Sequence, residues 1–304
     1  MSGEYVMTQS PLVSIIIPTY NRATDLKRAL DSVLSQNYQE WEAIIIDNHS
    51  TDNTDEIVKN FNDQRIQLHK IHNNGVIAAS RNLGLSKATG EYVALLDSDD
   101  WWTNDKLEKS VILLKGGYDF IYHPMYLVKD GHKLKWLKKT RCRQIADNSF
   151  RDLLQHGNTI NNSSAVFKKH LLKEAGKLSI EKDLIAIEDY DLWLRIAKTG
   201  ARFKLISESL GYYWIGGGNI SNDYRTLQTT IAISLRYQKE FQELELQKVY
   251  NWIYFAKAKS YFKLRNFTLA IETLKKVNYK ESDLRSNIKC RFILFISYIK
   301  KALS

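Results

Sequence analysis

The sequence is poor in the residues that interrupt or cross-link a chain. Its 304 residues include three prolines, 14 glycines and two cysteines. So little proline and glycine argues against a disordered or fibrous chain. The two cysteines, Cys142 and Cys290, lack the paired spacing of a metal site, which favours reduced thiols.

Long apolar runs and an export signal are also lacking. The longest apolar run, 292–299, is far shorter than the roughly 18–20 residues that cross a membrane. Residues 1–10 are polar and unlike a secretory signal, so we expect a cytoplasmic protein. A hydrophobic content of 44% over this length is sufficient for one large α/β core and a smaller unit.

Positive charge is present, and it is concentrated at one end. Residues 251–304 hold twelve Lys and Arg against three Asp and Glu, a net +9 of the total +10. A basic tail of this kind suits an anionic surface. No recognisable nucleic-acid module accompanies the charge, so we expect no nucleic-acid partner.

Strands and helices alternate over the first hundred residues. Continuous apolar runs predict strands that are buried on both faces, and apolar residues at helical spacing predict helices between them. This alternation indicates βαβ units and a parallel sheet. The predicted strands cover 12–17, 42–46, 66–71 and 92–96, and the predicted helices cover 26–34, 52–61 and 76–86.

The pattern is mixed from residue 103 and becomes helical after residue 221. Segments 120–128 and 133–137 flank Asp130-Gly131, which is typical of a hairpin. A helix is expected at 189–197 and late strands at 202–206 and 210–215. Residues 256–277 resemble one tetratricopeptide-type helical hairpin, and a helical appendage is favoured because an array needs about three repeats.

Polar clusters follow three of the predicted strands, at 18–21, 47–50 and 97–100. Parallel sheets bind ligands at this edge. The third cluster, Asp97 to Asp100, offers the carboxylate oxygens that hard divalent cations prefer. An acidic turn or helix N-cap is the alternative, and the apolar run before the cluster favours the metal site.

Five short motifs occur in a fixed order: residues 13–21 (VSIIIPTYN), 47–52 (DNHSTD), 73–84 with NNG and ASRNLG, 97–100 (DSDD) and 188–193 (EDYDLW). This ordered set resembles the family 2 glycosyltransferases over roughly residues 12–220. The resemblance implies an α/β GT-A fold, with a Rossmann-like, mostly parallel central sheet flanked by helices. It implies a catalytic domain at 1–220, with a nucleotide-sugar half to about 100 and an acceptor half beyond. A basic helical region at 221–304 lies outside the match.

The resemblance places the nucleotide-sugar donor against the loops after the first strands. Pro18, Tyr20 and Asn21 would lie beneath the nucleobase, where the Tyr20 ring either stacks on the base or packs on the rim. Asp47 would accept a hydrogen bond from the base or ribose, since burying a carboxylate without a partner costs free energy. Arg81 would face the nucleotide, with a surface ion pair as the alternative.

The same resemblance assigns the acidic cluster. Asp97 and Ser98 would lie at the ribose, and Asp99 would ligate Mn²⁺ or Mg²⁺. A divalent cation neutralises the charge of a departing diphosphate. Of Trp101 and Trp102, one would stack on a sugar and the other would belong to the core.

Glu188 and Asp189 resemble the acid pair that opens a helix near the acceptor. Inverting transfer needs a carboxylate that takes the proton of the attacking hydroxyl. We assign Asp189 as this base and Glu188 as the acid that orients it or the acceptor; both could instead complement the helix dipole. Asp191 either contacts the acceptor or faces the opposite side.

The chain departs from the family pattern at two places. Asn48 and His49 replace an Asp and a Gly that are common after the second strand. Gly216 fills the position at which many relatives carry a metal-reaching histidine. Asp99 would then be the sole direct protein ligand, and the glycines of 216–218 would form a flexible lid.

Residues 286–302 mix apolar and basic side chains in the pattern of a helix that lies in a membrane interface, with a packed helix as the alternative. We expect peripheral binding at the inner face of the cytoplasmic membrane.

The expected reaction is metal-dependent, inverting transfer of a hexose, from UDP-glucose or UDP-galactose, to form a β linkage. The expected acceptor is an undecaprenyl-diphosphate-linked glycan of O-antigen or capsule type. An N-acetylhexosaminyltransferase and a non-catalytic nucleotide- or glycan-binding scaffold are the alternatives.

Overall fold

The structure is a computed structural model that describes residues 10–129, 138–216, 223–244, 250–277, 279 and 284–303. The chain divides into two compact units, and each is described by itself. The division differs from the single boundary expected near residue 220, because two earlier segments group with the C-terminal helices. The sheet unit comprises Met1–Asp147, Ile160–Leu178 and Ala201–Gly216, and the helical unit comprises Asn148–Thr159, Ser179–Gly200 and Gly217–Ser304.

A seven-stranded sheet of order β3-β2-β1-β4-β8-β6-β9 forms the centre of the sheet unit. The first four strands of the chain pair in parallel, as predicted, whereas β8 runs antiparallel to β4 and β6. The strands are β1 (Val13–Thr19), β2 (Trp41–Asp47), β3 (Ile66–Lys70), β4 (Tyr92–Leu95), β6 (Phe120–Tyr122), β8 (Val166–Lys168) and β9 (Phe203–Leu205).

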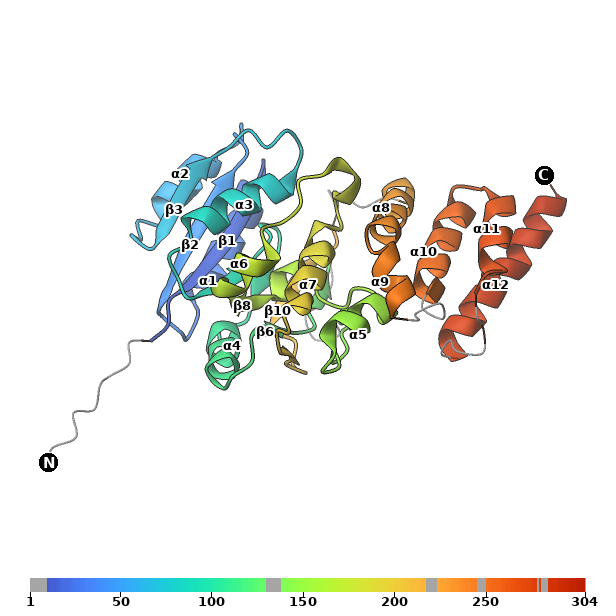
Figure 1. Cartoon of the computed structure of the whole chain (residues 1–304). Helices are drawn as coiled ribbons and strands as arrows, with labels where there is room; N and C mark the ends of the chain where they lie inside the picture. The colour runs from blue at the N-terminus through green and yellow to red at the C-terminus, as the bar shows by residue number, and fades with distance from the viewer. Residues whose placement is uncertain are drawn as a thin grey trace, which may run out of the picture. The chain divides into compact units, whose positions relative to one another are not determined.

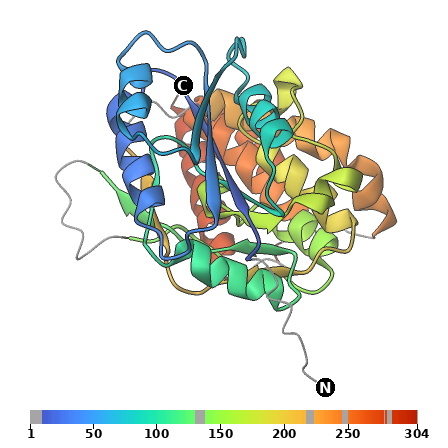
Figure 2. The same ribbon diagram turned by 90° about the vertical axis from the view of Figure 1, so that its left-hand side faces the viewer.

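Helices pack on both faces of this sheet, which explains why β1 and β2 are buried at every residue. Figure 2 shows α1 and α2 (blue) on one side of the strands and α3 (cyan) on the other. Gly84 allows the close approach of α3, because a Cβ there would lie 2.5 Å from Ile16 Cγ2. The helices of this unit are α1 (Ala23–Leu34), α2 (Thr54–Asn60), α3 (Ile77–Lys87), α4 (Lys106–Lys115) and α6 (Leu172–Ala175), with 3-10 helices η2 (Asn162–Ser164) and η3 (Lys169–Leu171).

A second sheet has the order β5-β10-β7, with β5 (Trp101–Trp102), β7 (Tyr126–Val128) and β10 (Gly211–Trp214). The single strand expected over 120–128 is therefore wrong. It divides into β6 and β7 around Pro124, which has no N–H to donate to a sheet. The hairpin turn at Asp130-Gly131 and the arm 133–137 lie outside the described residues. Beyond them, Lys138 O accepts from Leu127 N at 2.7 Å, so the chain returns beside β7.

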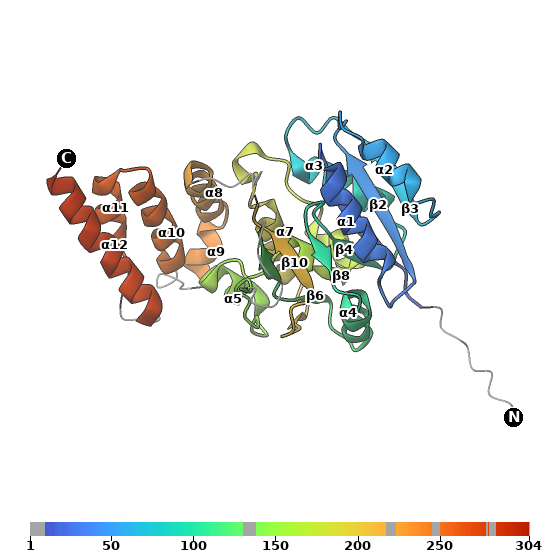
Figure 3. The same ribbon diagram turned by 180° about the vertical axis from the view of Figure 1, so that it is seen from behind.

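The described part of the helical unit consists of helices and their connections. Figures 1 and 3 show its last three helices side by side in chain order. The first two form the hairpin expected over 256–277, and the third packs on the second around a small core that includes Leu274 and Cys290. The elements are α5 (Ser149–His156), η4 (Lys182–Leu184), α7 (Glu188–Lys198), α8 (Asp223–Arg236), α9 (Gln238–Glu243), α10 (Tyr250–Lys263), α11 (Phe267–Leu274) and α12 (Leu284–Ala302).

Among the described helices, none combines the length and apolar character needed to cross a membrane. Cys142 and Cys290 are both thiols rather than halves of a disulfide. Cys142 is half-buried, and burial raises the pKa of its thiol to about 11. A thiol with a raised pKa carries little thiolate at neutral pH and is a poor nucleophile.

His123 and Lys106 are fully buried in the sheet unit. Lys106 Nζ lies 3.5 Å from the centre of the Trp102 ring. Nδ1 of His123 lies 3.0 Å from the carbonyl oxygen of Pro124, to which it can only donate. Burial, followed by the nearby Lys106, lowers the pKa of His123 to about 3.

We expect His123 to reduce stability as the pH falls from 6.5 toward about 3. In this window the unfolded chain binds a proton on His123 that the folded chain does not, so the free energy of unfolding falls with pH. His123→Phe should flatten the decline in melting temperature between about pH 7.5 and about pH 5. The exposed His170→Asn is the control, and equal declines in the two variants would contradict the prediction.

Candidate active site

The loops after β1 and β2 are locked together at the carboxyl edge of the sheet. Asn21 N donates to Ser50 Oγ at 2.8 Å, and Thr51 N donates to Asn21 Oδ1 at 2.7 Å. Asn21 has a φ of 49°, in the left-handed region that asparagine tolerates better than most residues. Pro18 is buried in β1, whereas Tyr20 is 55% exposed. The loop expected beneath the nucleobase is thus held by hydrogen bonds to the loop after β2, and it bears an exposed aromatic ring.

Asp47, the last residue of β2, is fully buried and is paired within the protein. Lys70 Nζ lies 2.7 Å from Asp47 Oδ2, and Ser50 N donates to the carboxylate at 3.1 Å. These partners offset the cost of burying the charge. Lys70 reaches Asp47 because the parallel register sets the last residue of β3 directly beside the last residue of β2.

Asp97 is held by side chains from two other elements. Arg81 Nη2, from α3, donates to Asp97 Oδ1 at 2.7 Å, and Asn162 Nδ2 donates to the same oxygen at 3.0 Å. Asp97 N donates to Ser163 Oγ at 3.0 Å. The Arg81 side chain is buried, so this is an internal ion pair rather than the surface pair considered above. Ser98 is buried beside it.

Asp100 joins the acidic loop, residues 97–100, to a part of the sheet unit that is distant in sequence. Its buried carboxylate accepts from Ser163 Oγ at 2.6 Å and from the backbone N of Trp214 at 2.9 Å. Burial, and then the charges of Asp97 and Asp99, raise the pKa of Asp100 well above its usual range. Its role is to join the loop to β10.

Asp99 presents a carboxylate that is more accessible than that of Asp100. Its side chain is 22% exposed, and its ion pair with Arg22 is long, at 3.9 Å. Burial, and then the adjacent Asp97 charge, raise the pKa of Asp99 to about 6. A cation placed here would relieve the repulsion between the two carboxylates, so the site fits a divalent metal.

No group of three or more His, Cys, Asp and Glu side chains that could hold a metal occurs among the described residues. A magnesium-type site that also uses substrate phosphates needs only one or two carboxylates. Asp99 therefore fits a metal that the donor diphosphate helps to ligate.

The two tryptophans have different surroundings, which resolves the alternative that the sequence left open. Trp102 is 2% exposed, and its indole N–H donates to a backbone carbonyl at 2.7 Å. Trp101 is half-buried, stacks on Tyr212 at 5.0 Å and lies 4.1 Å from the Arg28 guanidinium. Arg28 also donates to the backbone oxygen of Asp99 at 2.9 Å. Trp102 belongs to the core, and Trp101 is the candidate for a sugar contact.

Gly216 has a packing reason to be glycine. A Cβ at this position would lie 2.1 Å from Cζ2 of Trp214. A histidine could be placed there only if the Trp214 ring moved, which explains the departure from the family pattern. Gly217 and Gly218, the rest of the expected lid, lie outside the described residues.

In the helical unit, α7 begins with the predicted acid pair. Glu188 is buried, and its Oε2 accepts from Ala186 N at 2.6 Å. Asp189 is half-buried, and its Oδ1 accepts from Tyr190 N. Ala186 has a φ of 74°, a strained value of the kind that clusters at functional sites. Asp189 is the more accessible acid of the pair, and its role as the base stays a prediction.

Asp191 does not fit the acceptor contact suggested above. It is fully buried, and it lies 2.9 Å from Arg195 Nη2 and 2.9 Å from Arg236 Nε. The hydroxyl of Tyr237 donates to Asp191 Oδ1 at 2.9 Å. The carboxylate is thus consumed in joining α7 to α8 and to the start of α9.

Asp191→Ala should lower the free energy of unfolding by about 3 kcal/mol, because two arginines lose a buried counter-charge. The value is at the low end for buried pairs, since both arginines are partly exposed. Glu181→Ala, which removes the exposed partner of Arg236, is the control and should cost under about 1 kcal/mol. Urea unfolding of both variants tests this, and similar losses would rule out the network.

Residues 14–175 match the family described as Glycosyl transferase family 2. The chain belongs to this family. It is 32% identical over 237 residues to the UDP-Glc:alpha-D-GlcNAc-diphosphoundecaprenol beta-1,3-glucosyltransferase WfgD of Escherichia coli. The aligned region covers 78% of this chain and 83% of that protein. It is 30% identical over 261 residues to the putative teichuronic acid biosynthesis glycosyltransferase TuaG of Bacillus subtilis, with 84% and 98% covered.

The fold of this glycosyltransferase is GT-A. The mannosyltransferase PcManGT from Pyrobaculum calidifontis, solved in complex with GDP-Man and Mn²⁺, superposes with a TM-score of 0.59 at 18% identity. The match covers 97% of this chain and 87% of that one. At this identity the likeness concerns the fold, and it confirms the mostly parallel sheet flanked by helices.

Sequence reasoning missed the residues that hold the transferase's acidic loop. Ser163 bonds both Asp97 and Asp100, and Arg28 bonds the backbone of Asp99, yet neither belongs to a recognisable motif. Ser163 reaches the loop because β8, which follows η2, pairs with β4. Lys70 could have been found, since parallel pairing sets the ends of neighbouring strands side by side.

Proposed function

We propose that this family 2 transferase moves a hexose from UDP-glucose or UDP-galactose onto a lipid-linked glycan with inversion, and that it requires a divalent metal. The observation that carries the proposal is the acidic loop, in which the partly exposed Asp99, whose ion pair with Arg22 is long, lies beside Asp97, whose carboxylate is held by the buried Arg81 side chain. The name of the E. coli relative, which states a UDP-glucose donor, a diphosphoundecaprenol-linked acceptor and a β-1,3 linkage, supports this choice.

The sheet unit would bind the donor. The exposed ring of Tyr20 would stack on the nucleobase, with Asn21 bracing its loop. Asp47 would orient the base or ribose from the end of β2 while Lys70 neutralises its charge. Asp97, with Ser98 beside it, would contact the ribose, and Arg81 would hold the Asp97 carboxylate in place.

Asp99 would hold Mn²⁺ or Mg²⁺ together with the donor diphosphate. Such a metal, when bound, neutralises charge on the leaving group. The Mn²⁺ in the solved mannosyltransferase is consistent with this role for the fold. Arg28 would steady the loop through its bond to the backbone of Asp99.

Asp189 would act as the base on the acceptor side. It would take the proton of the acceptor hydroxyl as that oxygen attacks the anomeric carbon opposite the diphosphate, so the configuration inverts and a β product forms. Glu188 would position Asp189 by closing the turn at Ala186. Residues 1–220 would thus supply the chemistry, and Trp101 a sugar contact.

The basic region 221–304 would keep the enzyme peripheral on the inner face of the cytoplasmic membrane, where a lipid-linked intermediate of O-antigen or capsule synthesis is found. The relatives named for glycan-lipid and teichuronic acid synthesis support this setting.

A donor screen tests the proposal. The purified chain would be incubated with UDP-glucose, UDP-galactose, UDP-N-acetylglucosamine or GDP-mannose and a synthetic GlcNAc-diphosphate lipid, with and without a chelator. We expect metal-dependent UDP release with a UDP-hexose, and NMR of the product should show a β linkage. Preference for UDP-N-acetylglucosamine would point to the N-acetylhexosaminyl alternative, and no release with any donor would favour a binding scaffold.

A further inference from the structure

The last helix, α12, packs with one face and exposes an apolar stripe on the other. Cys290 and Ser297 are buried on the packed face, where Cys290 joins the small core with α11. The other face repeats every three or four residues, so its side chains form one line along the helix. The stripe consists of Ile288, Phe292, Phe295, Ile299 and, just past the helix end, Leu303, which are 40–79% exposed.

The charges around this stripe indicate what covers it. Helix α12 carries five basic residues and no acidic residue. At 100° per residue, the exposed Arg291 and Lys300 fall on opposite flanks of the stripe. A second copy of α12 would meet it with like charge, whereas an anionic lipid surface would be attracted. Long cationic side chains also suit this setting, since their stems can lie on apolar surface while the charge reaches the headgroups.

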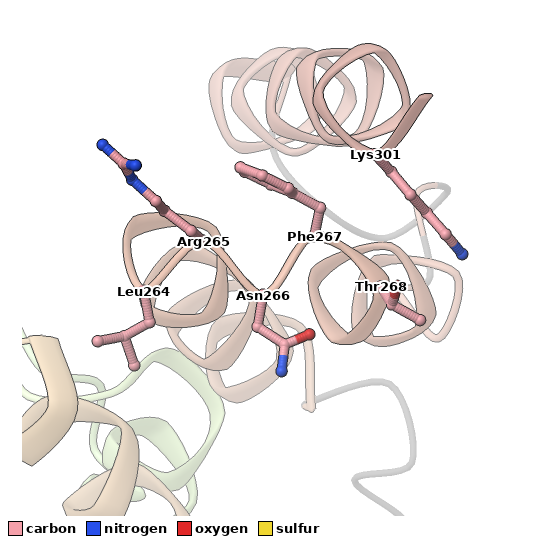
Figure 4. Close-up of a pocket in the computed structure, with 6 residues that line it drawn as sticks. All are labelled: Leu264, Arg265, Asn266, Phe267, Thr268 and Lys301. Carbon is pink, nitrogen blue, oxygen red and sulfur yellow. The ribbon is translucent and has the colours of Figure 1, made fainter. Parts of the chain in front are cut away.

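The basic groups at this end of the helical unit are spread out rather than gathered around one ligand. A pocket of about 370 Å³ lies at the α10–α11 turn, where Arg265 and Lys301 are the cationic residues of its lining. Figure 4 shows these two side chains pointing away from each other. Dispersed charge of this kind fits a layer of headgroups better than a single phosphate.

We propose that the outer face of α12 docks on an anionic lipid bilayer, with the apolar stripe entering the headgroup region and the flanking cations binding the headgroups. The inference rests on the proposed function, because it specifies how the enzyme would reach a lipid-linked acceptor. None of the stripe residues belongs to the donor or acceptor sites assigned above. Docking and chemistry can therefore be separated by mutation.

Co-sedimentation of the full chain with vesicles tests the proposal. We expect binding to phosphatidylcholine vesicles that contain phosphatidylglycerol, and weak binding to phosphatidylcholine alone. The double variant Phe292→Ser/Phe295→Ser should bind at least about tenfold more weakly, since each phenylalanine loses apolar burial in the interface. Ile112→Ser/Leu235→Ser removes two side chains of similar exposure from α4 and α8 and should bind like the parent protein.

The charge contribution has its own variant. Arg291→Gln/Lys300→Gln should remove much of the preference for phosphatidylglycerol. Added salt should likewise weaken binding of the parent protein to vesicles that contain phosphatidylglycerol. Equal binding to both vesicle types, or unchanged binding of the phenylalanine variant, would overturn the proposal. The proposal would also be overturned if Phe292→Ser/Phe295→Ser lost self-association, measured by sedimentation velocity, while its vesicle binding stayed unchanged.

Sugar transfer to a water-soluble acceptor keeps the two hypotheses apart. If vesicle binding fails while the parent protein still transfers to such an acceptor, the docking inference is wrong and the proposed function stands. If vesicle binding behaves as expected but no donor is used, the docking surface stands and the proposed function is wrong.

Discussion

Asp189→Asn should reduce sugar transfer by roughly 10²–10⁴-fold while donor binding stays near that of the parent protein. The amide has the size of the carboxylate and keeps an oxygen to accept from Tyr190 N, so α7 should begin as before. It cannot take up the proton of the attacking hydroxyl. The loss should therefore appear in kcat rather than in the affinity for the nucleotide.

Turnover would be followed as UDP release, and donor binding by calorimetry with UDP and Mn²⁺. Asp183→Asn is the matched control, because this acid is exposed on η4, six residues before Asp189, and should leave both quantities unchanged. Unchanged turnover in Asp189→Asn would refute the base assignment. A loss of fold, detectable in the melting temperature, is addressed by Asp189→Glu, which should recover part of the rate only if a carboxylate is required there.

Asp99→Asn should produce the second large loss, of roughly 10²–10³-fold in turnover at a fixed metal concentration. A metal ion at a departing oxyanion contributes several kcal/mol, and each 1.36 kcal/mol is a factor of ten in rate. The substitution removes the charge that attracts the cation but keeps Arg28 bonded to the backbone oxygen of the residue. The defect should thus lie in metal binding rather than in the shape of the loop.

A manganese titration separates these explanations. The concentration of Mn²⁺ for half-maximal activity should rise in Asp99→Asn and stay unchanged in Asp105→Asn, in which an acid paired with Lys109 is removed outside the site. If Asp99→Asn loses activity but keeps the parental metal response, Asp99 acts in another way. If it keeps full activity, the metal lies elsewhere or is not needed.

The N-terminal fold could be read from the sequence because its signals are local. Each residue of β1 and β2 is buried between helices, so each strand appears as one uninterrupted apolar run. The same reasoning failed at 120–128, where residues of high strand propensity serve two different sheets on either side of Pro124. Propensity describes the chain at one place and carries no information about which neighbour it pairs with.

The site residues divide in the same way, into those that local sequence signals place and those that only tertiary contacts place. The residue pattern by itself determined that Asp47 and the acidic loop lie at one edge of a parallel sheet, because parallel strands bring their carboxyl ends together; Arg81, on a helix, was placed there by the family resemblance. It could not show that Asp191 is consumed by arginines of α7 and α8, nor which tryptophan faces the core.

Only the tertiary structure decided which carboxylates of the acidic loop are already committed. Asp100 is held by the backbone of Trp214, 114 residues away, and Asp97 by Arg81 and Asn162. Asp99 is the least firmly held of the three, since its ion pair with Arg22 is long, at 3.9 Å. The physical reason is that a carboxylate's availability depends on burial and on partners brought in by folding, and neither is encoded in the spacing of the acids themselves.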